Sequence, residues 1–125
     1  MFIDASRYAL RVGPMPLTVL LTILILDALF IVLAVPLILK KVPRNRFYGF
    51  RVKATLENDF VWYETNAYFG RGFFIASVLS ACLIAGLYFF DLVAATDFTR
   101  ASLAVLIVPQ LLVVLLTFRF IRFLK

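Results

Sequence analysis

Residues 42–71 read VPRNRFYGFRVKATLENDFVWYETNAYFGR, which is the longest polar segment of the chain. It combines basic side chains with aromatic ones and with residues that favour turns and helix caps. The sequence on either side is apolar, and we interpret it as a membrane scaffold that holds this segment in place. Such a mixture is typical of a folded loop at a membrane surface, so the segment is the first candidate for a specific function.

The composition places the chain in a lipid bilayer. Hydrophobic residues make up 64% of its 125 positions and the mean hydropathy is +1.02, well outside the usual composition of soluble proteins. A chain of this length has room for one domain, which we expect to cover residues 1–125. The net charge of +6 lies largely beside apolar segments. Anionic lipid headgroups explain such charges better than nucleic acid does, so we expect no nucleic-acid partner.

The residue inventory argues against catalysis. The chain contains no histidine, and its single cysteine, Cys82, lies in an apolar run. This removes the common ligand sets for zinc, haem and iron–sulfur clusters, and it rules out a disulfide within the chain. Asp59 and Glu64 have no metal-ligand or nucleophile partner in the sequence. We therefore predict a protein that is not an enzyme and that has no catalytic residue, no metal and no cofactor.

Three apolar runs are suited to cross a membrane as helices. About 20 residues are needed for a crossing, and the runs cover residues 16–39, 73–94 and 101–118. Before the first run, residues 3–11 are expected to form a helix along the membrane interface. The predicted fold is an all-α membrane protein with three transmembrane helices, a structured cytoplasmic loop, and an interfacial helix extension between the first and second spans.

The loop and the helix extension are expected to meet at Thr55. Residues 43–53 are rich in turn formers, which disfavour a regular helix. Thr55 is a suitable N-cap, and Glu57 and Asp59 fall in the first turn, where the helix dipole favours negative charge. The sequence therefore predicts a helix that starts after Thr55 and can continue into the second span.

One face of this predicted helix carries polar and aromatic residues. Asn58, Trp62, Asn66 and Gly70 recur every four residues, so they share that face. Trp62, with Tyr63 beside it, is expected at headgroup depth, where amphipathic aromatic side chains collect.

Small residues mark one face of the second span. Ser77, Ala81 and Ala85 recur at four-residue spacing, with Ala76 and Ser80 alongside, and small residues at this spacing let another helix approach closely. Beyond this span, residues 91–100 are expected to form a short polar connection, with Thr99 as the N-cap of the third helix.

The distribution of basic residues predicts the orientation in the membrane. The connection at residues 40–72 holds seven Lys or Arg and the C-terminal tail holds three, whereas the second connection holds only Arg100. Lys and Arg are retained on the cytoplasmic side. Although Arg7 and Arg11 weigh against it, this count places the N-terminus outside and the loop and the C-terminus in the cytoplasm.

The segment at residues 42–71 contains a compact sequence signature. Its positions are Pro43, Asn45, Arg46, Tyr48, Gly49, Phe50, Arg51, Thr55, Leu56, Trp62, Asn66, Gly70 and Arg71. The pattern resembles the signature of the SdpI family of bacterial integral membrane proteins, in detail over residues 36–72 and in its three-span layout beyond. The resemblance implies a multi-pass protein of the bacterial cytoplasmic membrane that provides immunity, a form of bacteriocin resistance, against a secreted toxic peptide. In the prototype arrangement the protein also takes part in signal transduction, because it holds a transcriptional repressor at the membrane once toxin is present.

The signature residues are the candidate site. Their guanidinium groups could bind a lipid phosphate or an acidic partner, and the plainer alternative is that they only anchor the loop. Two asparagines are expected to form a polar network that locks the loop onto the helix, while Gly49 supplies a turn with positive φ and Gly70 allows close packing. The candidate partner- or lipid-binding residues are Asn45, Arg46, Tyr48, Gly49, Arg51, Thr55, Trp62, Asn66, Gly70 and Arg71.

Two polar residues lie in the middle of predicted spans. Asp27 is the only ionisable residue well inside a span, and Gln110 lies mid-span in the third. A carboxylate at the bilayer centre costs ~2.5 to 3.5 kcal/mol on insertion scales, so Asp27 should be neutral, paired or facing a cavity. Its candidate partners are Gln110, Ser77 and Ser80. It is interpreted either as a proton or ligand site or as one end of a hydrogen bond between helices.

Three functions compete. The leading hypothesis is an SdpI-like immunity or receptor protein that binds a toxic peptide or a soluble transcriptional regulator without catalysis. The second is a small accessory subunit of a larger membrane protein complex. The third is a transporter protomer that uses Asp27, which requires a homo-oligomer because three helices are too few to enclose an ordinary pathway. All three place the chain in contact with the lipid bilayer.

Overall fold

The computed structural model describes residues 14–125. The interfacial helix expected at residues 3–11 lies outside these residues. The described part contains the helices α2 (Leu17–Ile38), α3 (Lys53–Glu57), α4 (Asp59–Phe89) and α5 (Ala95–Leu124) and no strand. The helices α2, α4 and α5 are each long and apolar enough to cross a membrane. The prediction of an all-α protein with three spans is therefore confirmed.

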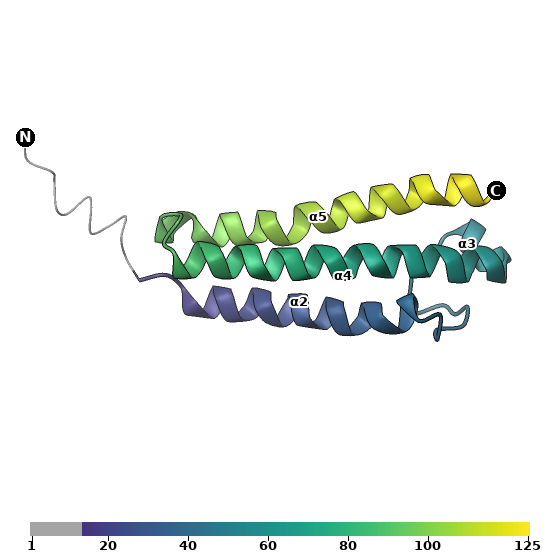
Figure 1. Cartoon of the computed structure of the whole chain (residues 1–125), viewed down its shortest axis with the longest axis horizontal. Helices are drawn as coiled ribbons and strands as arrows, with labels where there is room; N and C mark the ends of the chain where they lie inside the picture. Colours follow the sequence, from purple (N-terminus) through teal and green to yellow (C-terminus); the bar gives the residue numbers. More distant parts are fainter. Residues whose placement is uncertain (1–13) are drawn as a thin grey trace, which may run out of the picture.

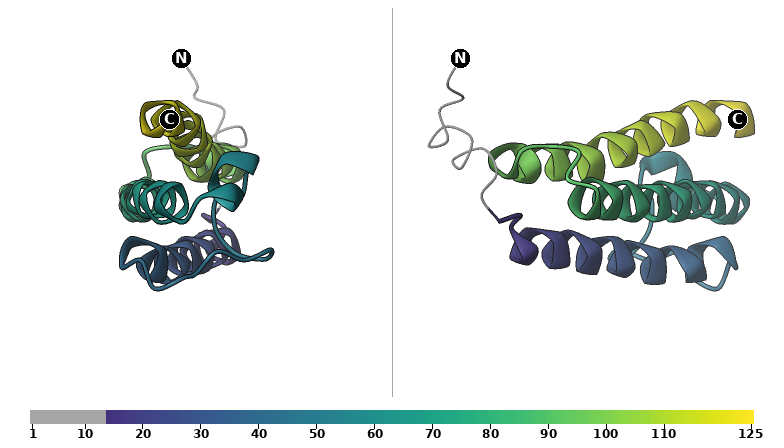
Figure 2. Two further views of the ribbon diagram at one scale, coloured as in Figure 1. Left: turned by 90° about the vertical axis from the view of Figure 1, so that its right-hand side faces the viewer. Right: turned by 60° about the vertical axis from the view of Figure 1, so that its left-hand side comes forward.

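The three long helices run side by side and alternate in direction (Figure 1). α4 packs against both α2 and α5, whereas α2 and α5 contact each other much less. The end-on view in Figure 2 shows α4 between its two neighbours, with the loop after α2 and the short α3 on one side. The loop, α3 and the C-terminus consequently lie together at one end of the bundle.

Two of the helices are longer than a membrane crossing requires. At 1.5 Å per residue, the 31 residues of α4 extend about 46 Å, compared with about 30 Å for the hydrocarbon core. The 30 residues of α5 have nearly the same length. Both helices can therefore project beyond the lipid, and the first turns of α4 form a wall for the loop that precedes them.

The boundaries of the last two helices differ from those predicted by hydropathy. The second span was expected at residues 73–94, but α4 ends at Phe89, where Asp91 adopts a positive φ of 50°. The third was expected at residues 101–118, but α5 covers Ala95–Leu124. Hydropathy follows contact with lipid, whereas a helix continues through polar residues as long as its backbone bonds form. Thr99 thus lies inside α5 and does not cap it.

The end of α2 explains why the chain turns sharply toward the loop. Lys40 has a left-handed backbone with φ of 55°. The amide of Lys41 donates to the carbonyl of Pro36 at 2.9 Å, and that of Lys40 donates to Leu37 at 3.2 Å. This is the bonding pattern of a Schellman motif, formed here without glycine.

The start of α4 corrects the predicted N-cap. Asn58, not Thr55, caps the long helix, because its side-chain oxygen accepts a hydrogen bond from the amide of Val61 at 3.2 Å. Thr55 lies inside α3, which ends at Glu57. The region predicted to be one helix is therefore two, with an extended residue at Asn58 between them.

The interior of the bundle is apolar at the end remote from the loop. A cluster of buried side chains consists of Leu20, Ile23, Ile84, Phe98 and Leu106. On α4 the buried positions near it are Ser77, Ser80 and Ile84, while Ala81 and Ala85 are only half-buried. The predicted small-residue face is therefore buried at Ala76, Ser77 and Ser80 but only partly at Ala81 and Ala85.

Candidate functional site

The loop after α2 is shaped by Asn45. Its side-chain oxygen accepts hydrogen bonds from the amides of Phe47, at 2.8 Å, and Tyr48, at 2.7 Å. Its side-chain amide donates to the carbonyls of Pro43, at 2.8 Å, and Tyr48, at 3.2 Å. One asparagine thus replaces the backbone bonds that a regular element would supply, which is the usual role of this residue in turns.

Asn66 joins this loop to α4. Its side-chain oxygen accepts a hydrogen bond from the buried amide of Phe50 at 2.6 Å, and its side-chain amide donates to the carbonyl of Trp62 at 2.9 Å. Gly49 lies beside this contact with φ of 113°, and a Cβ placed there would lie 2.6 Å from the Asn66 oxygen. The predicted positive φ at Gly49 is confirmed, and Asn66 locks the loop onto the helix as predicted. Asn45 takes no direct part in that lock, contrary to the prediction, because its hydrogen bonds stay within residues 43–48.

Two further side chains complete the attachment. The indole Nε1 of Trp62 donates to the carbonyl of Val42 at 2.8 Å, and Trp62 is fully buried. The hydroxyl of Thr55 accepts from the amide of Val52 at 3.0 Å and faces the carbonyls of Phe50 and Val52, each 2.9 Å away. Trp62 therefore packs inside the protein beneath the loop instead of facing lipid headgroups.

Aromatic packing fastens the loop to α5 as well as to α4. The ring of Phe50 lies 5.2 Å from that of Phe69 and 5.0 Å from that of Phe118, measured between centroids. Tyr68 stacks on Phe120 at 4.2 Å. The sequence alone did not reveal these partners, because Phe118 lies far along the chain in a run that hydropathy assigns to lipid.

Gly70 has a packing role, as predicted. A Cβ at Gly70 would lie 3.0 Å from the carbonyl oxygen of Ala34 and 3.1 Å from side-chain atoms of Leu37 and Ile38. The end of α2 therefore approaches α4 at a distance that a larger residue would increase.

The basic residues of the candidate site divide into paired and unpaired groups. Arg44 contacts Asp59 at 3.2 Å and donates to the carbonyl of Leu56 at 2.7 Å, while Lys40 pairs with Glu64. The three basic residues of the predicted site are exposed and form no ion pair with any residue from 14 to 125; they are Arg46, Arg51 and Arg71.

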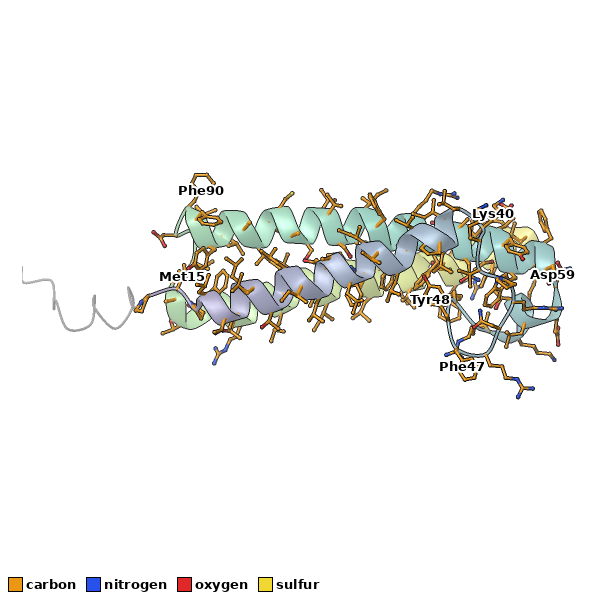
Figure 3. The ribbon with its side chains drawn as sticks, turned by 90° about the horizontal axis from the view of Figure 1, so that it is seen from below. Met15, Lys40, Phe47, Tyr48, Asp59 and Phe90 are labelled. Carbon is orange, nitrogen blue, oxygen red and sulfur yellow. The ribbon has the colours of Figure 1, made fainter. Side chains whose placement is uncertain are left out.

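Adjacent residues Phe47 and Tyr48 point in different directions. Phe47 is 90% exposed at the outer edge of the loop, whereas Tyr48 lies against the bundle (Figure 3). The hydroxyl of Tyr48 is buried without a hydrogen-bond partner in the described part of the chain. Burial raises the pKa of this phenol above its ordinary value, because the charged form loses its solvation.

A separate polar cluster lies in the middle of the bundle. The hydroxyl of Ser80 donates to the carboxyl oxygen Oδ2 of Asp27 at 3.0 Å, and Gln110 donates to the hydroxyl of Ser77 at 2.9 Å. Ser80 is thus the partner of Asp27 among the three candidates, whereas Gln110 pairs with Ser77. Oδ1 of Asp27 and Oε1 of Gln110 have no partner within residues 14–125. The cluster ties α2 and α5 to α4.

The site residues thus fall into three groups. The polar network and its supports bring together Asn45, Gly49, Thr55, Trp62 and Asn66 at the loop. Arg46 and Arg51 are exposed on the loop, Arg71 is exposed on α4 beside α5, and Tyr48 faces the bundle. Asp27 and Gln110 belong to the separate mid-bundle cluster. Among the described residues, no group of three His, Cys, Asp or Glu side chains could hold a metal ion.

Comparison with known proteins gives one match. The model of the SdpI/YfhL protein family matches residues 41–120. This range is more than half of the chain, and it contains the loop, α3, α4 and most of α5. Neither a curated protein nor a solved structure matches significantly.

Proposed function

The chain belongs to the SdpI/YfhL family, and from this premise we propose that it is a receptor or immunity protein of the bacterial cytoplasmic membrane that works by binding, without catalysis. In this proposal the bundle or its outer end engages a toxic peptide, and the loop at residues 43–53 binds a soluble regulator. The protein would then couple protection of the cell to a transcriptional response.

The observation that carries the proposal is the preorganised display of Arg46, Phe47 and Arg51. Hydrogen bonds of Asn45 and Asn66 hold the loop backbone, while these three neighbouring side chains are exposed. Arginine and aromatic side chains are enriched among the residues that dominate binding energy in protein interfaces. A rigid loop also loses little conformational entropy on binding.

A groove at the same end of the bundle enlarges this surface. It has a volume of about 530 Å³ and lies between α3, the start of α4 and the end of α5. Its lining is largely polar and includes Lys53, Glu57, Asn58 and Lys125. Such a lining suits a soluble protein partner better than lipid tails. Because basic residues favour the cytoplasmic side, we propose that this end faces the cytoplasm, with the N-terminus outside.

A crosslinked pull-down from native membranes, read by mass spectrometry, tests the proposal. The test variant is Arg46→Ala with Arg51→Ala, which removes the displayed charges without touching the hydrogen bonds of the loop. The matched control is Arg119→Ala with Arg122→Ala, which removes the same charge from exposed positions on α5 at the same end of the molecule.

We expect wild type and control to capture a soluble regulator or a secreted peptide that the loop variant loses. Retrieval of one large membrane complex by all three proteins would contradict the receptor role and favour an accessory subunit. Under the transporter alternative, Asp27→Asn would abolish pH-dependent flux. The bond from Ser80 to a fully buried Asp27 instead favours a structural role for this carboxyl group.

A further inference from the structure

A groove runs along the bundle on the side where α2 and α5 make few contacts with each other. Its first part is a cavity of about 190 Å³ lined by α2, α4 and the loop residues Tyr48 and Gly49. Its second part is a cavity of about 240 Å³ that reaches α5 at Ile107 and Gln110. The two cavities share Phe30 and Phe73 in their walls, so they adjoin. Together they lead from the loop toward the bundle centre.

The groove is open to lipid and long in the direction of the helices. Its wall on α2 extends from Phe30 to Leu37, about 10 Å at 1.5 Å per residue. Leu33, Ile107 and Leu111 in its walls are each more than 40% exposed. Nearly all of its lining is apolar, so the groove suits a hydrocarbon chain that enters from the bilayer.

The loop closes the groove at the end where a lipid headgroup would lie. Figure 3 shows Tyr48 nearer the middle of the bundle, along its long axis, than Lys40 or Asp59. In the sequence, Arg46 precedes and Arg51 follows the two loop residues of the groove wall, and both side chains are exposed. The carboxylates of Glu64 and Asp59, which lie on the first turns of α4, already have basic partners. The free charge beside this mouth is therefore positive.

We propose that the groove binds one acyl chain of an anionic phospholipid, whose phosphate is held by Arg46 and Arg51. Guanidinium groups bind phosphate through paired, charge-assisted hydrogen bonds. A transmembrane helix is about 10 Å across, which exceeds cavities of this volume, and the loop would obstruct its passage. This lipid site goes beyond the proposed function, although both use Arg46 and Arg51. Its test in vesicles contains no regulator or peptide, so its failure is distinguishable from failure of the proposed function.

The single tryptophan provides a local probe. Trp62 is the only tryptophan in the chain, and its Cη2 atom would lie 3.2 Å from a Cβ at Gly49, which lines the groove. Bromine on an acyl chain quenches indole fluorescence at short range. The experiment places the full chain in phosphatidylcholine vesicles doped with either brominated phosphatidylglycerol or brominated phosphatidylcholine, at equal low mole fractions.

We expect the anionic lipid to reach half-maximal quenching of Trp62 at about one tenth of the mole fraction that the zwitterionic lipid needs. Arg46→Ala with Arg51→Ala should abolish this preference, whereas Arg119→Ala with Arg122→Ala should keep it. Leu33→Phe, which fills the groove, should reduce quenching by both lipids. Leu79→Phe is the matched control, because Leu79 is 64% exposed on α4 and does not line either cavity.

Four results would overturn the inference, of which the first three come from the comparisons between lipids and variants. These three are equal quenching by the two lipids in the wild type, an unchanged signal in Leu33→Phe, and the same loss of preference in both arginine double variants. Quenching that weakens as the protein-to-lipid ratio rises would also overturn it, because a second copy of the chain would then occupy the groove. Far-UV circular dichroism of each variant checks that the helices are intact.

Discussion

The loop and the middle of the bundle differ in how their buried polar groups find hydrogen-bond partners. At the loop, the polar groups of Asn45, Asn66 and Thr55 all find partners, and the backbone amide of Phe50 is paired too. In the middle of the bundle, Asp27 and Gln110 each make one hydrogen bond and leave an oxygen without a partner in the described chain.

The difference follows from what each region must hold. A buried segment without helix or strand lacks the regular backbone hydrogen bonds of those elements, so side chains such as Asn66 must supply partners and thereby fix one conformation of the loop. Helices in the bilayer already satisfy their own backbones, and a hydrogen bond between them adds only ~0.6 kcal/mol on average. We therefore expect the conformation of the loop to depend on single residues, whereas the bundle should tolerate changes in its polar cluster.

Gly49→Ala should be the most damaging single change to the loop. The positive φ costs a residue with a Cβ about 1–3 kcal/mol, and displacement of Asn66 costs a further ~1–3 kcal/mol. Unfolding by sodium dodecyl sulfate, followed by Trp62 fluorescence, measures the effect. Gly86→Ala is the control, because a Cβ there meets nothing within 4 Å; it should raise stability by up to about 1 kcal/mol. Equal effects of the two changes would contradict the rigid loop.

Asn66→Ala should cost about 1–3 kcal/mol of unfolding free energy, because it leaves the buried amide of Phe50 without an acceptor. Asn58→Ala, which removes only the exposed cap of α4, should cost about 1 kcal/mol. The same unfolding assay compares them. If loss of the cap were the more damaging change, the loop would not depend on Asn66.

Mutation of Asp27 and Ser80 tests whether the bundle tolerates changes in its polar cluster. A double-mutant cycle with Asp27→Ala and Ser80→Ala should give a coupling of ~0.6 kcal/mol and at most ~1.7 kcal/mol. Asp27→Asn should leave folding intact, since an amide oxygen can still accept the bond from Ser80. A coupling well above this range, measured by unfolding in detergent, would remove the contrast between the two regions.

Tyr48→Phe should have the smallest effect at neutral pH. It removes a buried hydroxyl without a partner in the described chain, so stability should be unchanged or higher by up to about 1 kcal/mol. The raised pKa of Tyr48 means that the unfolded chain loses this proton first. The contribution of Tyr48 to wild-type stability should therefore be fully present below the ordinary pKa of 10.0. It should be lost as the pH rises through the higher folded pKa.

The alkaline part of this prediction is checked by unfolding wild type and Tyr48→Phe at a series of pH values from neutral to strongly alkaline. Both proteins contain the same remaining tyrosines, so the difference between the two proteins isolates Tyr48. If the unfolding free energies of the two proteins changed in parallel over the whole pH range, the phenol of Tyr48 would not be desolvated in the folded state.

The sequence predicted the number of membrane spans more accurately than the boundaries of the helices. Hydropathy located three spans but placed the third at residues 101–118, whereas α5 extends over Ala95–Leu124. Thr55 had the chemistry of an N-cap, yet its hydroxyl bonds to the preceding loop and Asn58 caps α4. Both errors arose because a local signal is compatible with several structures. Hydropathy does not register the polar ends of α5, and packing of the loop on α4 decided the role of Thr55.

Local chemistry was sufficient for much of the site. The turn at Gly49, the shared face of Trp62, Asn66 and Gly70, and the membrane class all follow from residue type and spacing along the chain. These features depend on each residue and its near neighbours, so the sequence by itself determined them.

Only the tertiary structure decided which distant groups meet. It paired Asp27 with Ser80 instead of Gln110, set Phe50 against Phe118, and left a groove between α2 and α5 beneath the loop. Such contacts depend on the relative rotation and axial register of packed helices. Those variables are set by the fit of whole surfaces, which no local pattern encodes.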